Sequence, residues 1–254
     1  MTNTVEIITV DATNVTKYGF FCYKSKPKSE GYRRKLDWLS RRFAEGMQIK
    51  MLIEDGRSVG FIEYIPSEFA WRAVNAAGYL VIHCLWVIGR AKNKGYGSRL
   101  LNECFETARN SNKHGVAMGT SRGNWLAGSD LLVKHGFESV DEAPPSFDLM
   151  VQTFGDAPLP TFPHNWEERL RQYGSGLIIF RSNQCPYLDD AVNTALETGQ
   201  ELGLQTRVIE LTSAQDVQHL APSVYGVFSL VYDGKLLSYN YELKKDLLKM
   251  LNGR

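Results

Sequence analysis

Hydrophobic and polar positions follow two different periods along the chain, most clearly between Tyr79 and Ala108. This stretch begins with an unbroken apolar run rich in β-branched and aromatic residues, which is typical of a strand buried on both faces. It ends with an apolar stripe at helical spacing, namely Leu100, Leu101, Cys104, Phe105 and Ala108. Between them lies the segment Lys92-Asn93-Lys94-Gly95-Tyr96-Gly97. The pattern predicts a strand, a basic glycine-containing turn and the N-terminus of a helix.

The other patterns in residues 1–155 predict a mixed α/β (α+β) sheet. We expect strands at 6–10, 48–53, 58–65, 115–120, 138–140 and 147–154, and helices at 33–43 and 126–134. Asp55-Gly56 is a strong hairpin-turn signal, and Gly136 suits the end of a helix. The loop at 67–77 carries Phe69 and Trp71, which either cover a pocket or pack on the body of the protein.

A second, smaller α/β domain is predicted at the C-terminal end. Pro158, Pro160 and Pro163 lie in a stretch without periodicity, so we place a linker at 156–170 between domains 1–155 and 171–254. Beyond it we expect a strand at 177–181, a helix at 186–202, a strand at 205–211, a hairpin at 224–241 and a final helix at 243–251. The order is βαβ followed by ββα.

Composition narrows the compartment and the partners. The chain has 254 residues, 43% hydrophobic and 22% charged, which is ordinary for a soluble globular protein. Its net charge of +1 gives no general attraction to nucleic acid or to an anionic membrane, and we find neither a signal peptide nor a membrane-spanning run. The four cysteines, at 22, 84, 104 and 185, form no close pairs. We therefore expect a cytoplasmic protein without a disulfide framework or a metal site.

The turn at 92–98 has the properties of an anion-binding site. The first N–H groups of a helix lack intrahelical partners and lie at the positive end of its dipole. Glycine allows close approach of the backbone to a phosphate, and lysine adds charge. The alternative is a plain strand-to-helix connection with solvated lysines. Two familiar phosphate motifs are excluded, because G-x-G-x-x-G would need glycine at position 100, which is Leu, and no G-x-x-x-x-G-K-[ST] occurs.

What remains, Lys92-x-x-Gly95-x-Gly97 between Val87 and Leu100-Leu101, resembles the acyl-CoA pyrophosphate loop of the GNAT family of N-acetyltransferases. Downstream, Asn124-x-x-Ala127 and Lys134-His135-Gly136-Phe137 resemble the second motif of that family at its usual separation. The resemblance covers about the first 155 residues. It implies the GNAT acyltransferase fold, acetyl-CoA as co-substrate, and direct attack of a primary amine on the thioester.

The C-terminal order resembles the core of the thioredoxin-like fold. Cys185-Pro186-Tyr187-Leu188 is similar to the C-P-Y-C turn of glutaredoxins, with Leu188 in place of the second cysteine, and Gly226 stands where the fold carries a cis-proline. The combination of domains resembles the YoaP-type proteins of bacteria. A thiol beside a helix N-terminus should have a lowered pKa, so Cys185 is a possible reactive thiol. The two departures favour a structural or partner-recognition role instead.

The family resemblance assigns residues to the cofactor. It implies that the backbone of Lys92, Asn93, Lys94, Gly95, Tyr96, Gly97 and Ser98 holds the pyrophosphate. A splayed strand end from Leu85 to Val87 would offer free N–H groups to the thioester carbonyl and the pantetheine, and Asn124 would hold the pantetheine arm. The tyrosine that often protonates the CoA thiolate in this family corresponds to Leu132, or to Leu131 when counted from Asn124. Neither side chain can donate a proton.

Two residues are candidates for the base. His83 is predicted to share a strand face with Leu85 and Val87, and its ordinary pKa near neutrality suits proton transfer; the alternative is a hydrogen-bonded core histidine. Glu63 is the second candidate, and the alternative there is a solvated carboxylate. We predict an acetyl-CoA-dependent N-acetyltransferase that acts on a small-molecule or peptide amine. The other hypothesis is a non-catalytic CoA-binding sensor or scaffold whose C-terminal domain binds a thiol compound or a protein partner.

Overall fold

In the computed structural model the chain forms two compact units, and the structure describes residues 4–122, 126 and 128–252. The first unit comprises Met1–Ser25, Leu39–Ala70 and Val74–Phe162. The second comprises Lys26–Trp38, Trp71–Ala73 and Pro163–Arg254. The two short segments of the second unit therefore lie within the range 1–155, which the sequence pattern assigned to a single domain.

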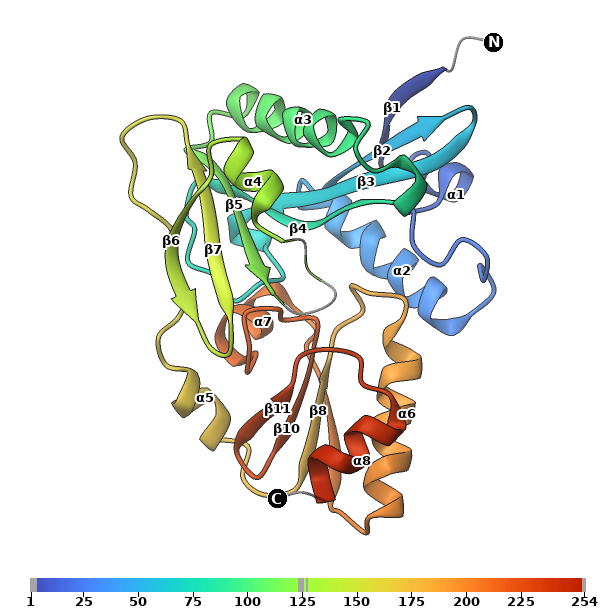
Figure 1. Cartoon of the computed structure of the whole chain (residues 1–254), viewed down its shortest axis with the longest axis vertical. Coiled ribbons are helices and arrows are strands. Elements are labelled where there is room, and N and C mark those ends of the chain that lie inside the picture. The colour runs from blue at the N-terminus through green and yellow to red at the C-terminus, as the bar shows by residue number, and fades with distance from the viewer. Residues whose placement is uncertain (1–3, 123–125, 127, 253–254) are drawn as a thin grey trace. The chain divides into compact units, whose positions relative to one another are not determined.

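The first unit is built on a seven-stranded sheet with the order β1-β2-β3-β4-β5-β7-β6 (Figure 1). All neighbouring strands are antiparallel except β4 and β5, which run parallel. The mixed sheet confirms the predicted fold class. The strands are β1 (Val5–Val10), β2 (Gln48–Glu54), β3 (Arg57–Pro66), β4 (Tyr79–Val87), β5 (Gly115–Ser121), β6 (Glu138–Ala143) and β7 (Phe147–Thr153).

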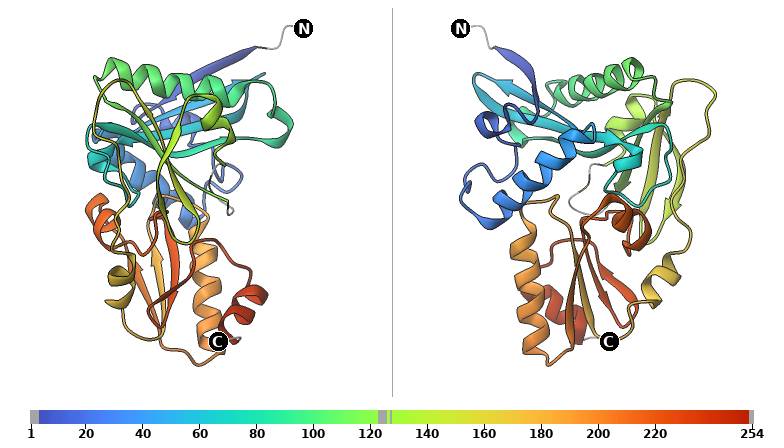
Figure 2. Two further views of the ribbon diagram at one scale, coloured as in Figure 1. Left: turned by 60° about the vertical axis from the view of Figure 1, so that its left-hand side comes forward. Right: turned by 180° about the vertical axis from the view of Figure 1, so that it is seen from behind.

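Helix α3 (Tyr96–Asn110) covers one face of this sheet and contacts β2 to β5 (Figures 1 and 2). All five residues of its predicted apolar stripe are buried, because they pack with β3, β4 and β5 in one hydrophobic core. The burial confirms the predicted amphipathic face. The other helical segments are α1 (Val15–Tyr18), α4 (Asp130–Lys134) and the 3₁₀ turns η1 (Ser67–Phe69) and η2 (Gly89–Ala91); α2 (Glu30–Ala44) has residues in both units.

The second unit contains a four-stranded sheet with the order β11-β10-β8-β9. β8 (Leu177–Arg181) is parallel to β9 (Thr206–Glu210), whereas β10 (Phe228–Tyr232) is antiparallel to β8 and to β11 (Lys235–Ser238). The predicted βαβ and ββα order is present. α6 (Leu188–Glu201) packs on β8, β9 and α8 (Lys244–Asn252).

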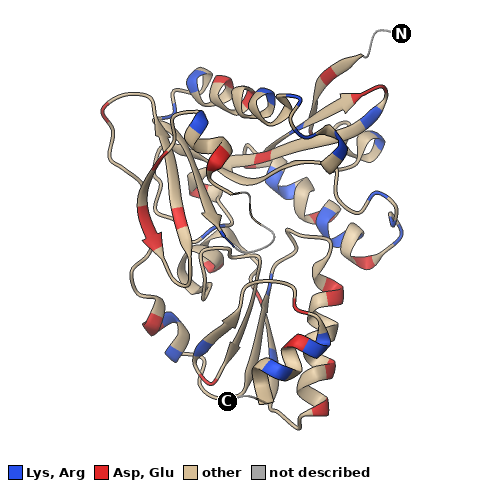
Figure 3. Cartoon of the chain, in the orientation of Figure 1, with Lys and Arg blue, Asp and Glu red and all other residues tan. Residues whose placement is uncertain are grey.

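Two helices of the second unit differ from the sequence expectations. α5 (Trp166–Arg171) overlaps the stretch predicted as a linker, and α7 (Ala214–Leu220) lies between β9 and β10. Acidic and basic residues are interspersed along the elements of each unit (Figure 3). Among the described residues, no helix has the length and apolar character needed to cross a membrane.

Candidate functional site

The turn from β4 into α3 leaves the positive end of a helix open. Gly95 is the N-cap residue of α3 and has φ of +74°, a left-handed conformation that glycine adopts at low cost. The first intrahelical bond runs from the Arg99 N–H to the Gly95 carbonyl at 3.1 Å. The N–H groups of residues 96–98 therefore have no intrahelical acceptor. The first turn of α3 holds no acidic residue and receives no side-chain cap.

A cleft of about 680 Å³ opens at this helix end. It is lined by most of the residues predicted to bind the cofactor, namely Leu85, Val87, Lys92, Asn93, Gly95, Tyr96, Gly97 and Ser98. Lys94 is not part of the lining, because its ammonium group lies 2.8 Å from the Glu54 carboxylate instead. Asn124 lies outside the described residues.

The end of β4 contributes backbone donors to the same cleft. β4 and β5 pair only over Tyr79–Val81 of β4, so the two strands part beyond that point. On its other side, the Ile88 N–H donates to the Val59 carbonyl on β3 at 2.9 Å. Because successive N–H groups point to opposite sides of a strand, those of Leu85 and Val87 point away from β3. These two N–H groups face the space that opens between the parted strands.

A β-bulge in β4 brings the two predicted base candidates together. Glu63 pairs with Cys84 and Tyr64 pairs with Ile82, which leaves His83 as the extra residue. The His83 Nδ1 lies 3.5 Å from the Glu63 Oε1, and both side chains are buried. The bulge also corrects a sequence prediction. Ile82 and Leu85 both enter the core beneath α3, so the alternation is broken and His83 is not in phase with Leu85.

Leucine side chains form the part of the cleft next to α4. Leu131 and Leu132 both line the cleft, and Leu132 is also fully buried in the core. A Cβ added at Gly97 would lie 2.7 Å from the Leu131 Cδ2, so glycine permits this close approach. Neither leucine carries a hydroxyl, as the sequence indicated, and no proton donor is present at either position.

Three residues of this region were missed by sequence reasoning. Trp86 lines the cleft with 49% of its surface exposed, and the Lys92 ammonium lies 5.7 Å from its ring centre. The His135 Nε2 is 2.8 Å from the Ser98 Oγ at the start of α3. Glu54 accepts from Lys94 across 40 residues of sequence. His135 stands in the motif Lys134-His135-Gly136-Phe137 and Trp86 in the strand end from Leu85 to Val87, which were usable signals, whereas Glu54 belongs to no pattern.

Comparison with known proteins decides the family. Residues 15–137 match the model of the acetyltransferase (GNAT) family. A curated relative from Bacillus subtilis (strain 168), the uncharacterized N-acetyltransferase YoaP, is 31% identical over 232 residues, which are 90% of each chain. The chain belongs to the GNAT family of acetyltransferases.

Solved GNAT structures align with part of this acetyltransferase. The PaiA N-acetyltransferase of Thermoplasma acidophilum, in complex with coenzyme A, is 18% identical and aligns over 59% of this chain and 99% of its own, with a TM-score of 0.44. A GNAT family acetyltransferase of Brucella melitensis, in complex with acetyl-CoA, is 16% identical and aligns over 63% and 94%, with a TM-score of 0.40.

The second unit of this GNAT protein also contains a strand-to-helix turn, at Cys185. The Leu188 N–H donates to the Cys185 carbonyl at 3.4 Å, and the half-buried thiol precedes α6. The first turn of α2 packs closely on this turn. A Cβ added at Gly31 would overlap the Pro186 carbonyl oxygen and come within 3.1 Å of the Asp189 Oδ2.

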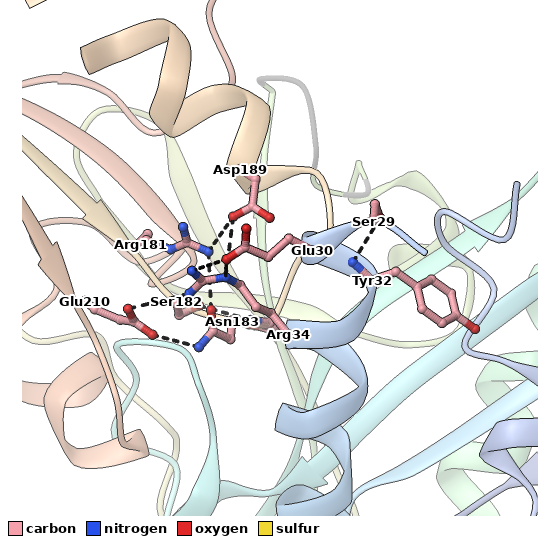
Figure 4. A network of polar contacts seen from close by, with 10 residues as sticks. Ser29, Glu30, Tyr32, Arg34, Arg181, Ser182, Asn183, Asp189 and Glu210 are labelled. Carbon is pink, nitrogen blue, oxygen red and sulfur yellow. Dashed lines mark hydrogen bonds and ion pairs between the residues drawn. The ribbon is translucent and has the colours of Figure 1, made fainter. Parts of the chain in front are cut away.

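An ion-pair network ties α2 to α6 within the second unit (Figure 4). The Arg181 guanidinium lies 2.9 Å from Asp189, and the Arg34 Nε lies 3.9 Å from the same carboxylate. Arg34 also contacts Glu30 and Glu210. The hydrogen bonds from Arg34 hold the pKa of Glu30 below its usual range. Charges from two helices and two strands therefore compensate one another beside the Cys185 turn.

Proposed function

We propose that this acetyltransferase transfers the acetyl group of acetyl-CoA to a primary amine of a small molecule or peptide. One observation carries the proposal: the open N-terminus of α3 and the end of β4 supply backbone donors to a single cleft. The helix end suits a pyrophosphate. The N–H groups of Leu85 and Val87 suit the thioester carbonyl, whose oxygen becomes negative when the amine attacks directly and forms a tetrahedral intermediate.

The Glu63–His83 pair is our proposed base. An amine attacks only when it is neutral, and a water molecule can carry its proton to the buried imidazole. The Glu63 carboxylate, 3.5 Å away, then offsets the charge that His83 acquires. Because residues 131 and 132 are leucines, the departing CoA thiolate takes up a proton from solvent or from the attacking amine. The ammonium form of the amine therefore loses two protons: His83 takes one before the attack, and the other leaves the tetrahedral intermediate while the sulfur gains one.

The test measures the loss of thioester absorbance when the protein is mixed with acetyl-CoA and a panel of primary amines. Detection of released CoA with a thiol reagent is avoided, because the cysteines of the chain would react with it too. We expect amine-dependent turnover, and His83→Gln or Glu63→Gln should lower kcat by about 10²- to 10⁴-fold. Glu103→Gln, which alters an acidic residue of α3 paired with Lys50, is the control. Tight acetyl-CoA binding without amine-dependent turnover would instead support the CoA-binding sensor.

For the C-terminal part we propose a thioredoxin-like module at 171–254, in which the Cys185 turn is structural. The order β8, α6, β9, α7, β10, β11, α8 supports the fold. The packing of Gly31 on Pro186 supports the structural role, because it covers one side of the turn. We also propose a cytoplasmic location, which the four free cysteines support.

A further inference from the structure

We infer that Glu54 is a positioning residue for acetyl-CoA, because it holds the two side chains on either side of Gly95 and thereby fixes the phosphate-binding turn before the ligand arrives. The inference rests on the proposed function, since acetyl-CoA is the ligand concerned. It gives a role to an acidic residue beside a site for an anion, where a carboxylate alone would be unfavourable.

Glu54 is anchored on a rigid element. It is the last residue of β2, and it pairs with Val5 of β1 on one side and with Arg57 of β3 on the other. Its side chain is largely buried, with 12% of its surface exposed. A group held on a paired strand can position a loop more accurately than a group on another loop.

The Glu54 Oε1 accepts two hydrogen bonds from the turn. The Lys94 Nζ donates at 2.8 Å and the Tyr96 hydroxyl at 2.5 Å. These donors belong to the residues directly before and after Gly95, so a single carboxylate oxygen holds both neighbours of the N-cap. Lys94 is thereby directed away from the cleft lining, while the backbone of Gly95 remains in it.

The turn needs such support because its backbone is unusual. Asn93 has φ of +63° and Gly95 has φ of +74°, both in the left-handed region. A glycine-containing turn samples many other conformations when nothing holds it. Fixing the turn in advance removes an entropic cost from ligand binding.

A purely electrostatic role for Glu54 would have the opposite sign. Removing a carboxylate near the helix N-terminus, and releasing the Lys94 ammonium, would strengthen the attraction for a pyrophosphate. Loss of a positioning contact would weaken binding. The direction of the change in CoA affinity therefore separates the two roles.

The experiment measures CoA binding to the full-length chain by titration calorimetry. We expect Glu54→Ala to weaken CoA binding by about tenfold and Tyr96→Phe, which changes no charge, by about threefold. The double variant should lose less than the product of the two, because both changes break one contact. In turnover assays the KM for acetyl-CoA should rise while kcat at saturating acetyl-CoA stays unchanged.

Glu103→Ala is the matched control, because it removes another lysine-paired carboxylate from the same unit, and it should leave CoA affinity unchanged. If the wild-type chain binds CoA and Glu54→Ala binds it equally well or more tightly, the positioning role of Glu54 is overturned while the proposed function stands. A wild-type chain that binds no CoA would overturn the proposed function itself. Should Glu54→Ala fail to fold, Tyr96→Phe and Glu54→Gln carry the same test, and wild-type affinity in both would overturn the inference.

Discussion

The turn between β4 and α3 and the turn between β8 and α6 each carry the chain from a buried strand to the N-terminus of a long helix. The first turn of α3 has no acidic residue, whereas that of α6 has Asp189 and Asp190. The α3 end opens into a cleft of about 680 Å³. The α6 end is packed by the α2 residue Gly31 and compensated by Arg181 and Arg34.

From this difference we infer what would make a common strand-to-helix turn a ligand site. A helix N-terminus attracts anions in every protein, but its own carboxylates can satisfy that attraction. In α6 the chain supplies the negative charge itself. In α3 the first turn holds no acidic residue, and the nearby carboxylate of Glu54 accepts from Lys94 and Tyr96 without being part of the cleft lining.

A large side chain placed at the open N-terminus of α3 should have the largest effect on acetyl-CoA affinity. In Gly97→Leu the new Cβ would lie 2.7 Å from the Leu131 Cδ2, so Leu131 must move, and both residues line the cleft. We expect acetyl-CoA affinity to fall by at least about 100-fold, equivalent to about 2.8 kcal/mol, with the fold retained. Calorimetric titration and circular dichroism measure the two quantities. Gly89→Ala, where an added Cβ meets nothing within 4 Å, is the control, and unchanged affinity in Gly97→Leu would contradict the cleft as the CoA site.

An acidic residue in the first turn of α3 should make this helix end resemble that of α6, where the chain supplies the negative charge itself. Ser98→Asp places a carboxylate at the helix N-terminus, where it should stabilise the folded chain by about 0.3–1 kcal/mol. The same carboxylate repels a pyrophosphate, so we expect CoA affinity to fall by about tenfold or more. Ser98→Asn, which also disturbs the contact with His135 but adds no charge, is the comparison. Equal losses in both variants would mean that charge at this position does not matter.

The turn between β4 and α3 could be predicted from the sequence, and so could the strand and the helix that it joins. The apolar run of β4, the five-residue stripe of α3 and the glycines between them are all local patterns. The residues predicted to bind the pyrophosphate through their backbone also stand together in sequence. For these reasons most of the residues predicted to bind the cofactor lie together in the lining of one cleft.

Features that depend on distant partners were not readable. The bulge at His83 arises from the register between β3 and β4, and a regular alternation therefore gave the wrong face. Glu54 meets Lys94 only after folding. Residues 26–38 join the second unit through packing at Gly31 and ion pairs of Arg34, none of which has a local signature. Helix α7 was not predicted although it has a local signature, the capping box formed by Ser213 and Asp216.

A substitution that disturbs the turn between β8 and α6 should change the free energy of unfolding and leave the affinity for CoA unaltered. Ala usually stabilises a helix by up to about 1 kcal/mol relative to Gly. Gly31→Ala should instead destabilise the chain by about 1–3 kcal/mol, because its methyl group meets the Pro186 carbonyl. Urea unfolding measures this loss, and CoA affinity should not change. Arg33→Ala, on the exposed side of α2, is the control. A stabilised Gly31→Ala would show that the packing is loose.

The Cys185 thiol, in the turn between β8 and α6, should differ from the other thiols by a smaller effect, its rate of labelling. We expect a thiol reagent at neutral pH to label the half-buried Cys185 faster than the fully buried Cys104. Burial raises the pKa of the Cys104 thiol, which should make it the slowest. Peptide mapping by mass spectrometry gives each rate, and Cys185→Ser confirms the assignment. Labelling of Cys185 as slow as that of Cys104 would mean that the packing of the turn shields its thiol from the reagent.

The pH dependence of the open turn should show the smallest effect. The hydrogen bonds from Lys94 and then Tyr96 lower the pKa of Glu54, and those bonds raise the pKa values of both donors. A carboxylate with a lowered pKa stabilises the folded state above its ordinary pKa of about 4.3, and this contribution is lost as the pH falls through the folded value. The difference in melting temperature between wild type and Glu54→Gln should therefore stay constant between about pH 5 and pH 9 and shrink only below about pH 4. The positive charge of Arg90 also lowers the pKa of Glu54, as the last of the causes. A difference that changed near pH 7 would mean that a histidine, and not this carboxylate, governs the turn.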